Sequence, residues 1–392
     1  MRITEIETFI VGNPWKNWMF VRVRTDEPGL YGIGEGTLNA FAKTVEAAVH
    51  ELAPFVRGMD PFQTEIIMQR LVRDVYSDGG QIHKAAATAI ETACWDIIGK
   101  ALGRPLYDLL GGRCHEKLRA YANGWYRGER EPEMFAGRAR EVVERGYTAL
   151  KFDPFGANWR TMTRREEDLS VAIVEAVRDA VGPEVDLLIE GHCRFSAAQA
   201  VAVGHRMAPF RPALFEEPVP HHNPAALVEV ARHLPFPVAC GESFHTLQQF
   251  AELLRHEAVQ ILQPEPLFLG VFATRQLAGM ADAHYAVLAP HSAQGPVCSA
   301  LCAQLNACTP NFYLHEIFDD FNDDATTWEN RIVTDPVVVE NGYITPSDRP
   351  GLGVDLNLEE MARHPYRQQN YLPLFRPGWE RREGAVSNVV SE

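Results

Sequence analysis

The sequence lacks the features of membrane, secreted and nucleic-acid-binding proteins. No apolar run approaches the roughly 20 residues that a membrane-spanning helix needs. The first residues, MRITEIETFI, contain neither the long apolar stretch nor the cleavage site of a signal peptide. The net charge of −15, from 37 basic and 52 acidic residues, argues against a nucleic-acid partner. We therefore expect a cytoplasmic protein that has no membrane and no nucleic-acid partner.

Cysteine is sparse and shows no pairing pattern. The chain has seven cysteines, an odd number, and no CxxC pair of the kind that binds zinc. Buried thiols in a reducing compartment explain them more simply than disulfides, which form mainly in secreted proteins. The hydrophobic fraction of 46 % is typical of a globular protein, and 392 residues suffice for a large domain with a smaller one.

The order of the expected elements divides the chain into three parts. Residues 1–115 begin with alternating, strand-like segments and continue with helical periodicity, so they are expected to form an α+β domain. Residues 116–345 repeat a unit of strand, loop and helix. Residues 346–392 hold several prolines, glycines and aromatic residues, and we expect them to return to the first domain.

The repeated unit predicts a parallel β/α barrel. Eight short apolar runs are its expected strands: LRAYANG, TALKFDP, VDLLIEG, PALFEEP, FPVACGE, VQILQPE, AVLAPHS and NFYLHEI. Seven helix-like stretches connect them, and the acidic stretch FDDFNDDATTWEN after the last run is expected to be a loop instead of an eighth helix. In such a barrel the active site lies at the carboxyl ends of the strands.

Ionisable side chains stand at the ends of six consecutive runs. They are separated by 23 to 26 residues, about one strand and one helix: Glu190, Glu216, Glu242, Glu265, His291 and Glu316. Carboxylates gathered at one mouth would repel each other unless a cation lay among them. Because carboxylate oxygens suit Mg²⁺, we predict that Glu190, Glu216 and Glu242 bind one Mg²⁺ per chain. The alternative for any one of them is a salt bridge to a nearby Arg or Lys.

The histidines near these strand ends are candidates for proton transfer. Glu265 and His291 end neighbouring strands, and a carboxylate bonded to one imidazole nitrogen raises the basicity of the other. His291 is therefore expected to be a general base, the alternative being a buried histidine bonded to a backbone carbonyl. His192 follows Glu190 by two residues and could be a general acid, a substrate donor or a fourth metal ligand.

Other polar residues near the expected mouth have more than one explanation. Glu316 could donate a hydrogen bond to an oxyanion if it is protonated, or could pair with a nearby cation. Lys151 and Asp153 alternate at the end of the second run and would share one face. Lys151 could neutralise a substrate carboxylate, or could pair with Asp153 or Glu190. Asp153 is also a candidate substrate contact.

Substrate specificity is expected to reside in loops of the first domain. Two segments are the candidates, Pro14–Asn17 and Tyr76–Gln81. Within the first of them, Trp15 and Lys16 are the candidate substrate contacts.

Together these segments resemble the enolase superfamily, and within it the mandelate racemase subgroup of acid-sugar dehydratases. The likeness covers nearly the whole chain and is carried by NWMFVRVRTDEPGLYGIGEG, AIETACWDIIGKALGRPLYDLLGG, FEEP, CGE, QPEP, APHS and PGLGVDLN. The resemblance implies an α/β fold in which a (β/α)7β modified TIM barrel lies under an α+β capping domain. It also implies that the C-terminal segment completes the capping domain.

The resemblance implies particular metal ligands and a particular base. The ligands are Glu190, Glu216 and Glu242, and the dyad on strands six and seven is Glu265 with His291. Two positions depart from the family pattern, since Glu190 and Glu265 both stand where aspartate is usual. The stretch from Glu265 to His291 is also one residue shorter than usual.

The resemblance further implies an acid. His192 matches the histidine that dehydratases of this kind use to protonate the leaving hydroxide, and Glu316 matches the glutamate that hydrogen-bonds the enediolate. The racemases carry a catalytic lysine at the position of Asp153. A racemase that uses one base on each face of the substrate is therefore not expected.

The predicted function is that of a carbon–oxygen lyase, a Mg²⁺-dependent dehydratase of an aldonate-like sugar acid. His291 would remove the proton α to the carboxylate and His192 would protonate the departing β-hydroxyl, which gives a 2-keto-3-deoxy acid. One alternative is an epimerase or cycloisomerase that acts on a sugar acid or its lactone through the same enediolate. Another is a non-catalytic barrel that binds a sugar acid. The expected partners are a small acid sugar and further copies of the chain in a homo-oligomer.

Overall fold

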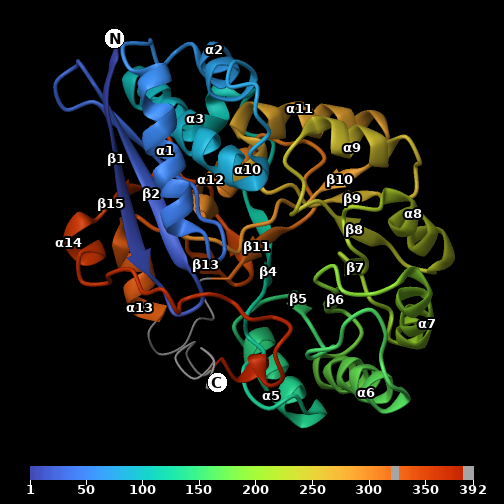
Figure 1. Cartoon of the computed structure of the whole chain (residues 1–392). Coiled ribbons are helices and arrows are strands. Elements are labelled where there is room, and N and C mark those ends of the chain that lie inside the picture. The colour runs from blue at the N-terminus through green and yellow to red at the C-terminus, as the bar shows by residue number, and fades with distance from the viewer. Residues whose placement is uncertain (319–325, 383–392) are drawn as a thin grey trace, which may run out of the picture.

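The structure is a computed structural model that describes residues 1–318 and 326–382 (Figure 1). An α+β cap, built from the N-terminal strands and helices, lies against one side of a β/α barrel. No helix in the described part of the chain is long and apolar enough to cross a membrane.

The cap consists of a small antiparallel sheet covered by helices. Its strands pair in the order β1 (Ile3–Gly12), β2 (Asn17–Thr25) and β3 (Tyr31–Glu35). Its helices are α1 (Ala42–Val56), α2 (Thr64–Met68), a π-helical turn (Gln69–Arg73), α3 (Gly80–Leu102) and α4 (Leu106–Leu109). Helix α3 packs directly on β3 because Gly32 has no side chain there: a Cβ at Gly32 would lie 1.9 Å from the Ala93 carbonyl oxygen.

The barrel has the predicted alternation of strands and helices. Its strands are β4 (Leu118–Ala122), β5 (Ala149–Phe152), β6 (Asp186–Glu190), β7 (Leu214–Glu216), β8 (Val238–Cys240), β9 (Ile261–Leu262), β10 (Val287–Leu288) and β11 (His315–Ile317). The intervening helices are α5 (Pro132–Glu144), α6 (Arg164–Val181), α7 (Ala197–Met207), α8 (Pro224–His233), α9 (Leu247–Leu254), α10 (Pro266–Leu269), α11 (Val271–Ala283) and α12 (Pro296–Ala307). Helices α10 and α11 follow β9 as one interrupted connection, so seven connections join the eight strands of the described barrel.

The barrel closes as a ring of parallel strands. Neighbouring strands from β4 to β10 pair in parallel, and β11 pairs in parallel with β4. The last gap, between β10 and β11, is bridged by Leu288 and Phe312, and the Leu288 amide donates to the Asn311 carbonyl at 2.9 Å. The predicted β/α barrel is therefore confirmed.

Strand alternation carries the site residues into the barrel. Ala149, Leu188 and Leu214 belong to the cluster that fills the barrel interior. Lys151 and Glu190 each lie two residues further along their strands, so period two places their side chains on the same inner face. The intervening apolar residues pack instead against the surrounding helices.

Two buried carboxylates fasten the cap to the barrel at helix N-termini. Glu35 of β3 accepts the Gly295 and Cys298 amides, at 2.7 and 2.9 Å, where α12 begins. Glu91 of α3 accepts the Val271 and Phe272 amides, at 3.0 and 3.2 Å, where α11 begins. The first turn of a helix has amide groups without intrahelical partners and favours negative charge. These contacts fix the cap beside the barrel mouth.

The chain after the barrel contacts both the barrel and the cap. The stretch FDDFNDDATTWEN, predicted to be a loop, has residues 319–325 outside the described part, and its end forms the single turn α13 (Thr326–Glu329). Next come a 3₁₀ turn (Asn330–Ile332), β12 (Val333–Thr334), β13 (Val339–Glu340), β14 (Tyr343–Ile344), β15 (Asp355–Leu356) and α14 (Leu358–Met361). Strand β14 pairs with the start of β4. The following segment contacts the cap, where Asn17 Nδ2 donates to the Arg367 carbonyl at 2.8 Å.

Candidate active site

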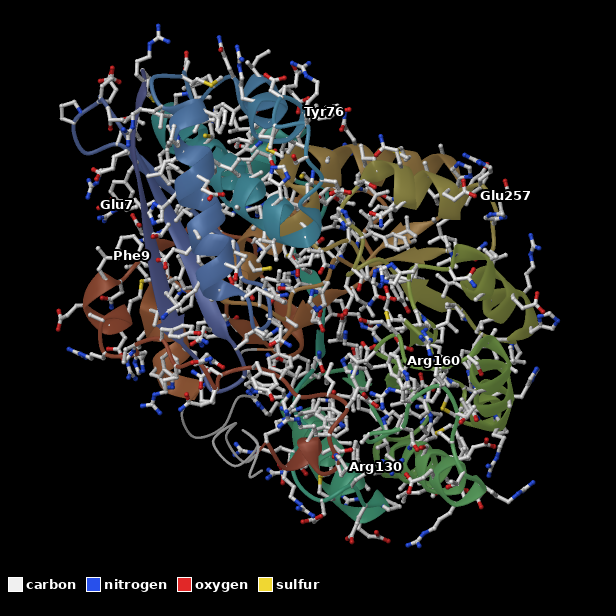
Figure 2. The ribbon with its side chains drawn as sticks, viewed as in Figure 1. Glu7, Phe9, Tyr76, Arg130, Arg160 and Glu257 are labelled. Atoms are coloured by element: carbon white, nitrogen blue, oxygen red, sulfur yellow. The ribbon has the colours of Figure 1, made fainter. Side chains whose placement is uncertain are left out.

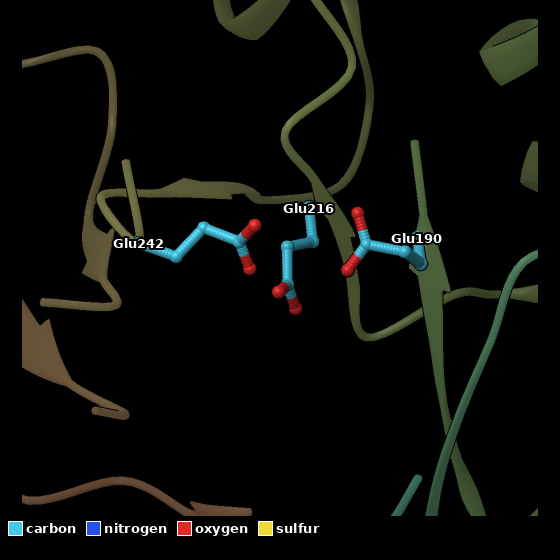
Figure 3. A group of neighbouring side chains, drawn as sticks. All are labelled: Glu190, Glu216 and Glu242. Atoms are coloured by element: carbon cyan, nitrogen blue, oxygen red, sulfur yellow. The ribbon is translucent and has the colours of Figure 1, made fainter. Parts of the chain in front are cut away.

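Three glutamates converge at the carboxyl ends of neighbouring barrel strands. Glu190 and Glu216 are the last residues of β6 and β7, and Glu242 lies two residues beyond β8. Their side chains point toward one another (Figure 3), and each offers a carboxylate oxygen within 4.8 Å of the others. The structure thus brings together the three residues predicted to bind a metal.

The carboxylate cluster fits a divalent cation. Burial and the nearby Glu242 raise the pKa of Glu190 to about 7, although Lys151 acts in the opposite direction. Burial and the nearby Glu190 raise the pKa of Glu216 well above its usual value. Burial also acts to raise the pKa of Glu242, but this pKa is lowered instead, by the charges of His291 and Lys151. Carboxylates gathered in this way repel one another unless a cation lies among them. Three hard oxygen donors in this arrangement suit Mg²⁺.

Lys151 lies inside the barrel beside this cluster. Its side chain is 2 % exposed, and Nζ lies 2.6 Å from Glu216 Oε1, 2.9 Å from Glu316 Oε1 and 3.2 Å from Glu190 Oε2. Burial alone would lower the pKa of Lys151, but Glu216 and Glu316 raise it well above its usual value. Of the partners considered for Lys151, the structure shows Glu190 and not Asp153, and it adds Glu216 and Glu316.

His291 and Glu265 form the predicted pair. His291 Nδ1 lies 2.7 Å from Glu265 Oε2, and Glu265 also accepts the Leu267 amide at 2.9 Å. The other ring nitrogen of His291 faces the carboxylate cluster, 3.4 Å from Glu242 Oε2. Burial lowers the pKa of His291, but Glu242, Glu316 and Glu265 together raise it to about 10.

A second histidine–carboxylate pair lies on the opposite side of the mouth. His192 Nδ1 lies 2.6 Å from Asp153 Oδ2, and Asp153 is fully buried. Arg194 donates to the same Asp153 oxygen and to the Gly191 carbonyl. Although burial raises the pKa of Asp153, Arg194 and His192 hold it below its usual value. Asp153 thus lies behind His192, and the cavity at the mouth is lined by the histidine.

Backbone geometry around His192 is unusual. His192 has φ of 46° and the following Cys193 has φ of 56°, both in the left-handed region that side chains rarely adopt. The His192 amide donates to Glu190 Oε1 at 2.7 Å, which ties this turn to the metal-ligand candidate. Strain of this kind persists where surrounding contacts enforce it, and it is frequent at functional sites.

Glu316 is an ionised acceptor in this arrangement. It accepts Asn123 Nδ2 at 2.8 Å, the Ser292 amide at 2.8 Å and Lys151 Nζ at 2.9 Å. Burial raises its pKa, but Lys151 and His291 bring it down to about 2. Of the two explanations for Glu316, the geometry favours the partner of a cation over the protonated donor.

Residues of the cap and of the C-terminal segment line the cavity at the mouth. Trp15 and Lys16 line the cavity, and Lys16 Nζ donates to the Ala293 carbonyl at 2.9 Å. Burial lowers the pKa of Lys16. Of the second predicted loop, Gln81 lines the cavity and donates to the Ser243 carbonyl at 3.0 Å, whereas Tyr76 is 98 % exposed at the outer surface of the cap (Figure 2).

Several residues of the site were not predicted. Gln263 donates to Glu216 Oε2 at 2.6 Å, and Gln294 donates to Glu265 Oε2 at 3.2 Å. Asn123 bonds Glu316 as described, and it is the last residue but one of the first strand run, LRAYANG. Gln263 and Asn123 are polar residues next to strand ends, and this position could have identified them as site residues.

The cap, the barrel and the carboxylate centre define a capped β/α-barrel protein with a site suited to a divalent cation. The chain belongs to the mandelate racemase and muconate lactonizing enzyme family of the enolase superfamily. The family model described as mandelate racemase / muconate lactonizing enzyme, N-terminal domain, matches residues 10–111. The model described as enolase C-terminal domain-like matches residues 134–361.

Individual relatives match most or nearly all of the chain. The chain is 35 % identical to the D-gluconate dehydratase of Thermoproteus tenax, over 89 % of this chain and 70 % of the relative. It is 33 % identical to the D-galactonate dehydratase of Pectobacterium atrosepticum, over 99 % of this chain and 100 % of the relative. The crystal structure of a mandelate racemase/muconate lactonizing enzyme from Jannaschia sp. CCS1 superposes with a TM-score of 0.87 at 32 % identity, over 94 % of this chain and 98 % of that one.

Proposed function

We propose that the protein is a Mg²⁺-dependent dehydratase of an aldonate-like sugar acid. The observation that carries this proposal is the presence of two histidine–carboxylate pairs, one on each side of a three-carboxylate centre. His192 follows β6 and His291 follows β10, which are four strands apart in a ring of eight. Removal of a proton and departure of a hydroxyl group need a base and an acid in separate places. Relatives named D-gluconate and D-galactonate dehydratase support a hydroxylated acid as substrate.

The carboxylate centre and Lys151 would prepare the substrate for proton removal. A Mg²⁺ ion held by Glu190, Glu216 and Glu242 would supply a Lewis acid for the substrate carboxylate and for the enediolate that forms from it. Lys151 places a permanent positive charge on the same side of the barrel, 2.9 Å from Glu316. Fixed charges in a buried site stabilise developing negative charge with little reorganisation.

His291 is the proposed base. Its Nδ1 is bonded to Glu265, so Nε2 is the nitrogen that faces the mouth and can accept the α-proton. Despite burial, the pKa of His291 is raised to about 10 because its ring faces the carboxylates of Glu242, Glu316 and Glu265. A cation held by Glu242 would leave less negative charge facing His291 and would lower its pKa toward the range of a base at neutral pH.

His192 is the proposed acid. Hydroxide is a poor leaving group, so its departure needs a proton in the transition state. Asp153 bonds Nδ1 of His192 and leaves Nε2 to deliver that proton to the β-hydroxyl. The enol that remains after loss of water ketonises to a 2-keto-3-deoxy acid.

The proposal is tested by incubating the enzyme with a set of C5 and C6 aldonates and Mg²⁺, with semicarbazide detection of keto acids. At least one aldonate should give a 2-keto acid, chelation should stop the reaction, and added Mg²⁺ should restore it. Appearance of an epimer without any keto acid would assign the site to the epimerase alternative. Full activity in thoroughly demetallated enzyme would contradict the metal role.

We also propose that the enzyme acts in the cytoplasm as a homo-oligomer. All seven cysteines are free thiols, and five of them are buried, which supports a reducing compartment. Exposed Phe55, Phe62 and Ile66 on and between α1 and α2 offer apolar surface for a contact between copies. Light scattering after size-exclusion chromatography would measure the oligomeric state, and a monomer would contradict this proposal.

A further inference from the structure

Four aromatic side chains from four separate segments line the cavity and form what we call the aromatic wall: Trp15, Tyr126, Phe318 and Trp379. Trp15 and Phe318 meet edge to face with ring centroids 5.0 Å apart. Tyr126 and Trp379 meet in the same way at 6.2 Å. The aromatic wall therefore joins the loop between β1 and β2, two barrel loops and the C-terminal segment.

Arg382 lies against this wall from the side of the C-terminal segment. The guanidinium carbon is 3.9 Å from the Trp15 ring centroid, 5.1 Å from that of Tyr126 and 5.8 Å from that of Phe318. Nη1 donates to the Gly124 carbonyl. Nε and Nη2 are buried and meet no acceptor in good hydrogen-bond geometry among the described residues, although Tyr126 interacts with the guanidinium closely enough to oppose the lowering of the Arg382 pKa by burial.

The surroundings of Arg382 make it an unusual arginine. Buried charges are ordinarily paired with an opposite charge, yet no carboxylate of the described residues forms an ion pair with Arg382. Burial lowers its pKa to about 9. Tyr126 and Glu380 oppose this lowering of the pKa. Attraction between the guanidinium and the ring faces adds to the compensation, because it is stronger away from water. The attraction between the guanidinium and the rings depends on the positions of the rings.

We propose that Arg382 is a positioning residue that holds the aromatic wall around the distal carbons of the substrate and so contributes to substrate choice. Without the cation, the Trp15 ring loses its contact with Arg382, which is the shortest contact between the guanidinium and the wall. If the aromatic wall is ordered before the substrate binds, less binding free energy is lost in ordering it.

This inference rests on the proposed function for the direction of the substrate. Its carboxylate and α-carbon would lie between the carboxylate centre and His291, and its β-carbon at His192. The Trp379 ring packs edge-on to the His192 ring, with centroids 6.3 Å apart. The carbons beyond the β-position therefore extend along the aromatic wall, where Arg382 acts through Trp15 and Tyr126.

The test compares Arg382→Met with Arg381→Met in the full chain. Methionine keeps much of the length of arginine but removes the cation and its unpaired donors. Arg381 is the matched control, because it is the preceding residue, is exposed and pairs with Glu129 at 2.7 Å. Two quantities are measured: kcat and KM for the aldonate that is turned over, and amide hydrogen exchange of peptides covering residues 13–18.

Arg382→Met should raise KM by about 10-fold or more, the range for a desolvated cation–π contact, with kcat changed by less than about 3-fold. Exchange of the loop amides should accelerate in this variant and not in Arg381→Met. Unchanged KM and unchanged exchange overturn the inference. A lower melting temperature with unchanged KM and exchange also overturns it, because Arg382 would then only anchor the chain end.

Arg382→Lys keeps the test decisive if the methionine variant does not fold. Lysine retains the charge but not the flat guanidinium, so KM and loop exchange should both rise above their wild-type values. Wild-type values for both would overturn the inference. If no aldonate is turned over by the wild type, the proposed function fails on its own, and loop exchange alone decides whether Arg382 orders the wall.

Discussion

The two histidines at the barrel mouth are bonded alike but face different charges. Each bonds a buried carboxylate through Nδ1. His291 also faces Glu242, whereas Arg194 shares the charge of the carboxylate behind His192. His192 therefore meets less uncompensated negative charge than His291. Each histidine reaches the mouth from its own side, so one can act as the base while the other acts as the acid.

Replacement of His291 should remove the base and leave the fold intact. His291→Asn is expected to lower turnover by about 10²-fold or more, since general base catalysis contributes at least that much. Exchange of the substrate α-hydrogen with solvent deuterium should disappear as well, which NMR would measure. The control is His284→Asn, an exposed histidine at the end of α11 that should behave as wild type. If exchange continues at the normal rate, another residue is the base.

Replacement of Asp153 tests its position behind His192. Asp153→Asn should lower the yield of keto acid by about 10-fold or more, because His192 loses the partner that orients it. It should also reduce stability, since Arg194 is left as a buried charge without a partner, at about 3–5 kcal/mol. The control is Asp168→Asn, which breaks only an exposed pair with Arg206. Equal loss of keto acid and of α-hydrogen exchange would make Asp153 a structural residue only.

At the scale of elements, strand periodicity and spacing were sufficient to predict the barrel and its mouth. The strand-end positions of Glu190, Glu216 and Glu242 follow from the repeat alone, and the structure brings them together. The strand lengths could not be predicted in the same way. The runs VQILQPE and AVLAPHS contain strands of only two residues, because Pro264 and Pro290 have no amide hydrogen for a strand ladder.

The sequence pattern could not predict contacts between distant elements. Examples are Gln263 on Glu216, Arg194 on Asp153 and Arg382 on Trp15, which depend on how segments distant in the sequence come together. No local periodicity specifies such contacts, since the partners lie on different elements. The role of Asp153 illustrates this: its residue type allowed a substrate contact, and only the turn at His192 reveals its other partner.

Glu91 of α3 joins the cap to the start of α11. Glu91→Gln should destabilise the protein by about 1–3 kcal/mol, because an amide nitrogen replaces one acceptor and leaves buried N–H groups unsatisfied. Urea-induced unfolding would measure the change. The control is Glu65→Gln on α2, an exposed glutamate whose replacement should have little effect. A stability equal to that of wild type would show that the bonds from Glu91 to the start of α11 do not hold the cap.

At the scale of the whole molecule, the site is complete only where three parts of the chain meet. The barrel supplies the carboxylate centre and both histidines, and the cap supplies Trp15 and Lys16. The C-terminal segment supplies Trp379 and is itself bound to the cap, where the Leu372 amide donates to Asn39 at 3.0 Å. Glu216 and Glu316 are fully buried, and burial strengthens the charge interactions within the centre.

The central claim is that the two histidines divide proton removal and loss of water between them. One NMR time course in D₂O tests it, with His192→Asn, an aldonate that the wild type dehydrates, and Mg²⁺. The account predicts that keto acid stops forming while deuterium still enters the α-position of recovered substrate, because His291 can form the enediolate and return it. Loss of neither activity would contradict the claim by making His192 dispensable. Equal loss of both would contradict it by making His192 a substrate or metal contact, and would favour the epimerase alternative.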